Sequence, residues 1–168
     1  MQTGYPGTPV AWDAMPDIMI RLAGAGDVAR LAGLRRAAAA ERDGAAAADD
    51  TFEDRFATWY ESESRAGRLT WLAEADGALV GMMNLAVFER MPRPGRDSGR
   101  WGYVGNAFVL PAYRDQGTGS RLLAAILRYA DERGFARVVL SPSERSVPFY
   151  RRAGFGPADA LLLRPGEG

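Results

Sequence analysis

The chain has 168 residues with 21 basic and 21 acidic side chains, so its formal net charge is zero, and it contains no histidine, cysteine or lysine. This balance argues against bulk electrostatic binding of nucleic acid or an anionic membrane, and no apolar run approaches the ~20 residues that span a bilayer. Without histidine or cysteine there is no thiolate nucleophile, imidazole base or ordinary zinc site, so we expect no metal. Catalysis would use carboxylates, tyrosine, hydroxyls, backbone amides or a substrate that arrives already activated.

The length predicts one domain with a single substantial core. Residues 1–17 are rich in glycine and proline and are interpreted as a flexible tail before a domain over residues 18–168. No basic region followed by an apolar segment marks a secretory signal, so we expect a cytoplasmic protein.

The first part of the domain predicts a strand and a helix. Ile18–Leu22 has the composition of a strand, and Asp27 can cap the helix that follows. The alanine-rich segment 37–48 around Arg42 offers little to bury. We expect it to fray or to form a flexible connection.

A second helix has a clearer signal. Thr51 and Asp54 approximate a capping box, with aspartate in place of the preferred glutamate. Phe52, Phe56 and Trp59 then recur at i, i+4 and i+7 and form an aromatic stripe. The simplest interpretation is that this stripe belongs to the core.

Three strands are predicted next. Residues 69–74 and 79–88 form a hairpin pattern with a turn at Asp76-Gly77, and residues 101–109 form the third strand. The intervening loop, 89–100, contains Arg90, Arg93, Arg96 and Arg100. This loop is either a solvated connection or a flap that recognises a substrate.

The third strand runs into a turn that contains Gly117 and Gly119 and then into an amphipathic helix over residues 118–133, which ends at Gly134. Glycines at a helix start allow a close approach to unpaired backbone N–H groups and to the positive end of the helix dipole. Such a turn can cradle an anion, most often phosphate, although an ordinary tight turn has the same glycines.

The last part of the chain predicts a buried strand over 137–141, a short helix and a final strand over 159–164. Ser143 or Ser146 can cap the short helix, which carries Phe149 and Tyr150. The order of the elements predicts a mixed α/β fold in which helices pack against one central sheet.

Two motifs in this half resemble those of the GCN5-related N-acetyltransferases (the GNAT superfamily). The sequence R-D-Q-G-T-G, 114–119, lies between a strand and a helix and resembles the acetyl-CoA loop of that family. The block F-Y-R-R-A-G-F, 149–155, resembles the family pattern Y-x-x-x-G-F. A phosphate-binding P-loop is excluded because it needs lysine, and a dinucleotide fingerprint would need G-x-G-x-x-G. Ser143 replaces an asparagine that family members often have.

The resemblance implies the acyl-CoA N-acyltransferase fold, with a mostly antiparallel twisted sheet flanked by helices, and acetyl-CoA as cosubstrate. Backbone groups of Ala107 and Val109 would pair with the pantetheine arm as if it were an added strand. Main-chain N–H groups of the glycine turn would surround the pyrophosphate, and Arg114 would add charge. The residues implied to bind the cosubstrate are Ala107, Phe108, Val109, Arg114, Asp115, Gln116, Gly117, Thr118, Gly119, Ser120 and Ser143.

The same resemblance implies that an acceptor amine attacks the thioester directly and that Tyr150 donates a proton to the departing thiolate. A tyrosine pKa of about 10 exceeds the ~8.5 of a thiol, so tyrosine is protonated at neutral pH and can act as the acid. Considered without the resemblance, Tyr150 is a half-buried core aromatic with its hydroxyl at the surface. Glu89 and Asp97 are candidates for the base, and Asn106 for orienting a water, but no base is assigned.

Nothing in the sequence chooses among a small metabolite, an antibiotic and a peptide N-terminus as the acceptor. The arginines of the 89–100 loop favour an acceptor with a carboxylate or phosphate over a polycation. In the family, the helix with the aromatic stripe often borders the acceptor cleft, and members often form homodimers. The alternatives are a non-catalytic acyl-CoA-binding sensor and a structural protein whose turn binds nothing.

Overall fold

The computed structural model describes residues 17–44, 48–95 and 98–166. The predicted tail lies outside these residues except for Asp17, and so do Arg96 and Asp97. None of the described helices is long and apolar enough to cross a membrane.

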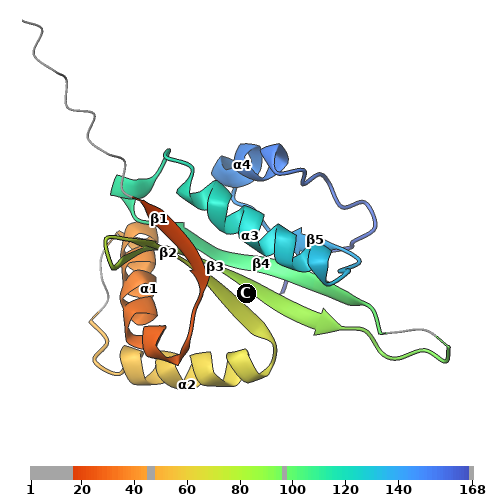
Figure 1. The fold of residues 1–168 in the computed structure, drawn as a ribbon, viewed down its shortest axis with the longest axis horizontal. Coiled ribbons are helices and arrows are strands. Elements are labelled where there is room, and N and C mark those ends of the chain that lie inside the picture. The colour runs from red at the N-terminus through yellow and green to blue at the C-terminus, as the bar shows by residue number, and fades with distance from the viewer. Residues whose placement is uncertain (1–16, 45–47, 96–97, 167–168) are drawn as a thin grey trace, which may run out of the picture.

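The described residues form one five-stranded sheet with strand order β1-β2-β3-β4-β5 (Figure 1). Strands β1 to β4 are antiparallel neighbours, and β5 pairs in parallel with β4. The strands are β1 Ile18–Leu22, β2 Arg68–Ala75, β3 Ala78–Glu89, β4 Arg100–Val109 and β5 Val138–Leu140. The α-helices are α1 Val28–Asp43, α2 Phe52–Arg65, α3 Thr118–Glu132 and α4 Val147–Arg152. Single 3₁₀ turns occur at Ala25–Asp27, Pro111–Tyr113 and Glu144–Ser146. This arrangement confirms the predicted mixed α/β fold with a mostly antiparallel sheet.

The sheet is covered on both faces. Helix α3 lies over one face, and α1 and α2 lie on the opposite side (Figure 1). Side chains of a strand alternate between faces, so Trp71 of β2 joins the cluster beneath α3, whereas Leu72 packs in a second cluster with Leu31 of α1. Leu122 and Ile126 of the apolar stripe of α3 are fully buried, as the spacing of the stripe predicts.

An irregularity in the β3–β4 ladder shapes the middle of the sheet. Met82 pairs with Phe108, but Asn84 pairs with Gly105, so β4 contains an extra residue between these pairs. Asn106 lies in this bulge with a positive φ of 50°. Bulges bend a strand and redirect its side chains, and they occur often beside functional sites.

Two predictions about local structure were wrong, the first for part of its segment and the second for the whole of it. Helix α1 continues to Asp43, through residues 37–43 of the segment expected to fray or to form a flexible connection, because alanine has the highest helix propensity and Glu41 pairs with Arg114. Residues 45–47 of that segment lie outside the described residues. The final strand predicted over 159–164 does not form, and Leu162 is 100% exposed. A short apolar run becomes a strand only when a neighbouring strand completes its ladder, and here no described strand pairs with it.

The predicted caps are correct in position but not in their hydrogen bonds. Asp27 precedes α1, yet its carboxylate accepts from Arg21 and from the backbone N–H of Gly24. Thr51 precedes α2, but its hydroxyl donates to Asp49, so no capping box forms.

Ser143 precedes the 3₁₀ turn at 144–146, and Ser146 precedes helix α4. Neither side chain caps a helix. Their hydroxyls lie 3.0 Å from each other instead.

Candidate active site

The turn between β4 and α3 has the geometry of an anion-binding site. Asp115 and Gly117 both have positive φ, 58° and 81°. Helix α3 begins directly after Gly117, whose carbonyl accepts the first backbone hydrogen bond of the helix, from Arg121. The N–H groups of the first turn have no acceptors inside the helix, and they coincide with the positive end of its dipole.

Two side chains of the turn make hydrogen bonds to backbone carbonyls that precede it. Thr118 is buried, and its hydroxyl donates to the carbonyl of Tyr113 over 2.9 Å. The amide of Gln116 donates to the carbonyl of Ala112 over 2.9 Å. These two bonds stabilise the turn from within, so they leave its backbone amides as the groups that can meet a ligand.

Strand β4 has an open edge beside this turn. Strand β5 pairs with β4 only from Gly102 to Val104, and no described strand pairs with the same edge from Gly105 to Val109. A backbone edge of this kind can accept an extended chain through the hydrogen bonds of an added strand. The edge contains Ala107, Phe108 and Val109, the strand residues that the sequence predicts to meet a cosubstrate.

Arg114 joins three elements around the turn. Its Nε donates to the carbonyl of Val109 over 2.8 Å, and its Nη atoms donate to the carboxylate of Glu41 in α1 over 2.9 and 2.6 Å. The guanidinium carbon also lies 5.6 Å from the centre of the Phe108 ring. The Arg114 charge is therefore paired with Glu41, which in turn has a lowered pKa because of this hydrogen bond.

Tyr150 is more buried than the sequence suggested. Its side chain belongs to the main core and is 8% exposed, with edge-on contacts to Phe149 and Phe155 at centroid distances of 4.8 and 5.8 Å. The hydroxyl makes no hydrogen bond to a described residue, yet it is not sealed from solvent. Burial raises the pKa of Tyr150, and the nearby Tyr103 hydroxyl raises it further. The phenol therefore stays protonated at neutral pH.

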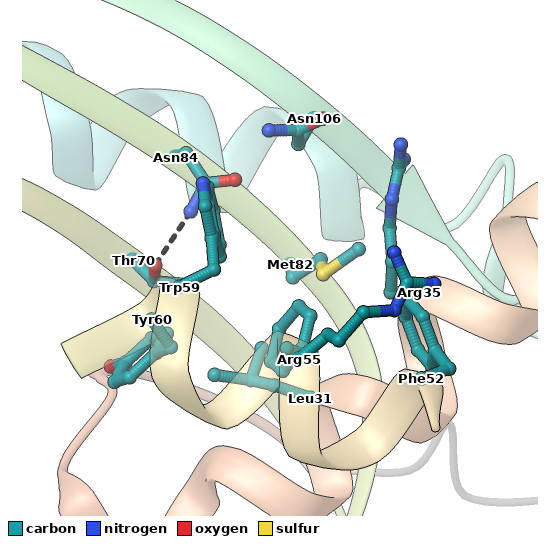
Figure 2. A pocket seen from close by; sticks show the side chains of 11 residues that line it. Leu31, Arg35, Phe52, Arg55, Trp59, Tyr60, Thr70, Met82, Asn84 and Asn106 are labelled. Carbon is teal, nitrogen blue, oxygen red and sulfur yellow. Dashed lines mark hydrogen bonds between the residues drawn. The ribbon is translucent and has the colours of Figure 1, made fainter. Parts of the chain in front are cut away.

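A pocket of about 400 Å³ lies next to the β4 bulge, and Asn106 of the bulge is one of its lining residues (Figure 2). Helices α1 and α2 and strands β2 to β4 all contribute side chains to it. The lining residues are Leu31, Arg35, Phe52, Arg55, Phe56, Trp59, Tyr60, Thr70, Met82, Asn84 and Asn106. Its size is in the usual range for small-molecule sites.

The aromatic stripe of α2 forms a wall of this pocket, and Phe56 of the stripe also packs against the second core cluster. No residue of α2 is fully buried, and Trp59 is 39% exposed. The core interpretation of the stripe is therefore correct only for Phe56, because helical periodicity identifies an apolar face but not what that face meets.

Polar groups form the pocket's inner side. Asn84 is buried and donates from Nδ2 to the hydroxyl of Thr70 over 2.6 Å (Figure 2). Tyr60 is partly buried, and desolvation raises its pKa. Asn106 reaches the pocket from the bulge of β4, the strand that also provides the open edge.

Comparison with known proteins shows to which family the chain with this combination of a glycine turn, an open strand edge and an adjacent pocket belongs. Residues 32–155, which include helix α1 from its fifth residue onward, all of α2, strand β4, the glycine turn and Tyr150, match the acetyltransferase (GNAT) family. The chain belongs to this family. The GNAT resemblance of the two sequence motifs is therefore confirmed.

One curated relative is a glucosamine 6-phosphate N-acetyltransferase of Trypanosoma brucei brucei, 32% identical over 93 residues. The match covers 54% of this chain and 61% of that protein, so the chain spans about three-fifths of the relative's length.

Solved GNAT structures share the fold over almost their full length. A GCN5-related N-acetyltransferase from Ralstonia eutropha is 27% identical with a TM-score of 0.67, and the match covers 90% of this chain and 99% of that one. A predicted acetyltransferase from Clostridium acetobutylicum, whose structure was determined with acetyl-CoA, is 21% identical with a TM-score of 0.69, covering 88% and 96%.

The GNAT fold brings most of the predicted site residues together, but not all of them. Residues 107–109 and 114–120 lie together where β4 leads into α3, whereas Ser143 follows β5 and its hydroxyl contacts that of Ser146. Glu89 pairs with Arg100 at the far end of the β3–β4 hairpin, and no described residue of the arginine-rich loop lines the pocket. Asp97, the other candidate base, lies outside the described residues.

Of the polar residues of the pocket, sequence reasoning named Asn106 and missed the others, Arg35 and Asn84 among them. Arg35 falls in a helix that looked purely structural, and Asn84 falls inside an apolar strand. An isolated asparagine in such a run was the one available signal, because a buried amide needs a partner.

Proposed function

We propose that this GNAT protein transfers the acetyl group of acetyl-CoA to a primary amine of a small molecule, by direct attack of the amine on the thioester. The observation that carries the proposal is the adjacency of the glycine turn, the open edge of β4 and the pocket behind Asn106. Strand β4 thus borders two sites. The glycine turn and the open strand edge suit an extended ligand that carries phosphate, and the pocket suits a second, smaller ligand.

The turn fits the pyrophosphate of the cosubstrate. N–H groups of Gly117, Thr118, Gly119 and Ser120 at the start of α3 donate to phosphate oxygens, aided by the helix dipole. The side chain of Arg114 contributes by fixing the carbonyl of Val109 and the course of the turn. Ser143, before the last helix, lies where the family often has an asparagine that contacts the cosubstrate.

Strand β4 positions the pantetheine arm. The backbone of Ala107 to Val109 supplies the donors and acceptors for an added strand, with Phe108 between the two pairing residues. Acetyl-CoA itself supplies an activated acyl group, which is why the chain needs neither a metal nor a nucleophilic side chain. A backbone N–H of this strand stabilises the oxyanion that forms at the carbonyl.

Tyr150 serves as the general acid. Its raised pKa keeps the proton on the phenol until the thiolate departs, and the retained solvent contact of its hydroxyl leaves that proton within reach of a ligand. Thiolates have a conjugate-acid pKa of about 8.5, so the departing sulfur requires only modest assistance.

The pocket between α1, α2 and β2 to β4 holds the acceptor. None of the described residues that line it is a carboxylate, so no side chain is assigned as the base, and water in the open pocket is available to accept the proton of the amine. Its volume suits a metabolite-sized amine better than a folded protein partner.

Release of free thiol from acetyl-CoA in the presence of a panel of primary amines tests the proposal. We expect thiol release that depends on both the protein and an amine, with an equal amount of N-acetylated product. Binding of acetyl-CoA with no thiol release across the panel would favour a non-catalytic sensor.

A further inference from the structure

The charges that line the acceptor pocket are of one sign. Its ionisable side chains other than Tyr60 are Arg35 and Arg55, and no aspartate or glutamate is among the lining residues (Figure 2). Arg55 forms an ion pair with Asp49 at the start of the α2 segment. Arg35 has no carboxylate within ion-pair distance in the described part of the chain.

The fold directs Arg35 to the pocket. It lies one helical turn after Leu31, whose buried side chain also lines the cavity, so the two share a face of α1. Its neighbour Arg36 points elsewhere, binds both oxygens of Glu53 and stacks on the Phe52 ring at 4.9 Å. Of these two adjacent arginines, Arg36 has its charge compensated and Arg35 offers its charge to the pocket.

The opposite wall can hold the body of a ligand. Phe56 and Trp59 lie with ring centroids 5.6 Å apart and face the cavity from α2. Such rings bind the flat apolar face of an organic molecule, whether an aromatic ring or the C–H face of a sugar. A polycationic amine would meet a guanidinium and no compensating acid, which disfavours it.

We propose that the acceptor is a small amine that also carries an anionic group, carboxylate or phosphate, and that Arg35 binds this anion while Phe56 and Trp59 pack against the body. This assignment rests on the proposed acetyl transfer and names its substrate class. A guanidinium binds carboxylate and phosphate oxygens through paired, charge-assisted hydrogen bonds. The site is distinct from the glycine turn, which meets the phosphates of the cosubstrate through backbone amides.

Calorimetric titration of the protein saturated with CoA, which supports no turnover, tests this assignment. Two matched pairs serve as probes: glucosamine 6-phosphate against glucosamine, and phenylalanine against phenethylamine. We expect the anionic member of at least one pair to bind roughly tenfold tighter or more, and the pair that responds identifies phosphate or carboxylate. In Arg35→Gln this preference falls to within about twofold, whereas Arg128→Gln, an exposed α3 arginine outside the pocket, retains it.

Three results would overturn the assignment. These are equal binding or no binding of both members in both pairs, a preference that survives Arg35→Gln, and a preference lost instead in Arg93→Gln on the β3–β4 hairpin. Thiol release measured with the same proteins and amines, but with acetyl-CoA in place of CoA, separates the two proposals. Turnover of the neutral amines alone would keep acetyl transfer and overturn the anionic acceptor, while anion binding without turnover of any amine would overturn acetyl transfer.

Discussion

Glu41 and Arg114 are 73 positions apart in the sequence, yet both oxygens of the Glu41 carboxylate accept hydrogen bonds from the Arg114 guanidinium, at 2.9 and 2.6 Å. Through this pair, helix α1 is attached to the turn that begins α3. The same guanidinium binds the carbonyl of Val109 at the end of β4. Because α1 also carries Arg35, the pair connects the proposed acceptor pocket to the proposed cosubstrate site.

The first prediction concerns this connection. Glu41→Gln should weaken acetyl-CoA binding by about two- to fivefold, since the exposed pair contributes modestly, and Arg114→Met should weaken it more because the Val109 contact is lost as well. Calorimetric titration measures both. The control is Glu61→Gln, which removes a surface ion pair with Arg65 on α2 and should leave the affinity unchanged. Equal affinities in all three variants would show that the turn needs no support from α1.

The second prediction concerns Asp27 and pH. Hydrogen bonds from Arg21 lower the pKa of Asp27 from 3.8 to about 2. Because the folded-state pKa is the lower one, the unfolded chain takes up the proton first, and the stabilisation is full above about pH 5 and declines as the pH falls toward 2. It amounts to about 1–2 kcal/mol at pH 7 after allowance for solvent screening.

Asp27→Asn should therefore lower the free energy of unfolding at pH 7 by about this amount, and the difference from wild type should shrink between pH 5 and pH 3. Urea unfolding at several pH values gives both quantities. A difference that stays constant over this range would mean that the ionised carboxylate does not contribute.

The third prediction concerns the glycine at the start of the β4–β5 pairing. A Cβ at Gly102 would lie 2.6 Å from Cδ1 of Leu85 and 3.3 Å from the Phe135 ring, both in or against the core. Gly102→Ala should thus destabilise the fold by about 1–3 kcal/mol through overpacking. The same substitution at Gly33, in α1 with nothing within 4 Å, should stabilise it by ~0.5–1 kcal/mol. Thermal or urea unfolding that gives both changes the same sign would contradict the packing around Gly102.

The fourth prediction concerns Tyr150. Tyr150→Phe keeps the ring and its contacts with Phe149 and Phe155, so the fold and the acetyl-CoA affinity should change little, within about twofold. The rate constant kcat should fall by about a hundredfold, in line with the loss of a general acid. Thiol release and calorimetry on one preparation measure the two effects. An unchanged kcat would leave Tyr150 as a core aromatic only.

The parts of the fold that depend on local signals could be predicted from the sequence. The glycine turn and the helix after it are encoded by residues 109–133 in one continuous stretch, and the structure has them as predicted. The strand predicted over 159–164 failed because three leucines in a row specify burial only if a partner exists. The prediction that the alanine-rich end of α1 would fray failed because its stabilising partner could not be seen locally. That partner, Arg114, binds Glu41 but lies 73 positions away in the chain.

The candidate site divides in the same way. The residues proposed for the cosubstrate are nearly contiguous, so their motif was visible. The proposed acceptor pocket combines Arg35, Trp59, Asn84 and Asn106 from four different elements, and no local pattern relates them. Likewise, the arginine-rich loop looked like an anion site by composition, but the topology places its described residues at the end of a hairpin, away from the pocket.

The most direct test of acetyl-CoA binding at the glycine turn is a calorimetric titration of the wild type and two charge variants. Ser120→Glu places a carboxylate in the first turn of α3, where it favours the helix dipole but repels a pyrophosphate, and Ser62→Glu adds the same charge to an exposed position of α2. We predict that the wild type and Ser62→Glu bind acetyl-CoA with similar affinity and that folded Ser120→Glu binds at least about tenfold more weakly. Equal binding by all three proteins, or no binding by folded wild type, would contradict the account.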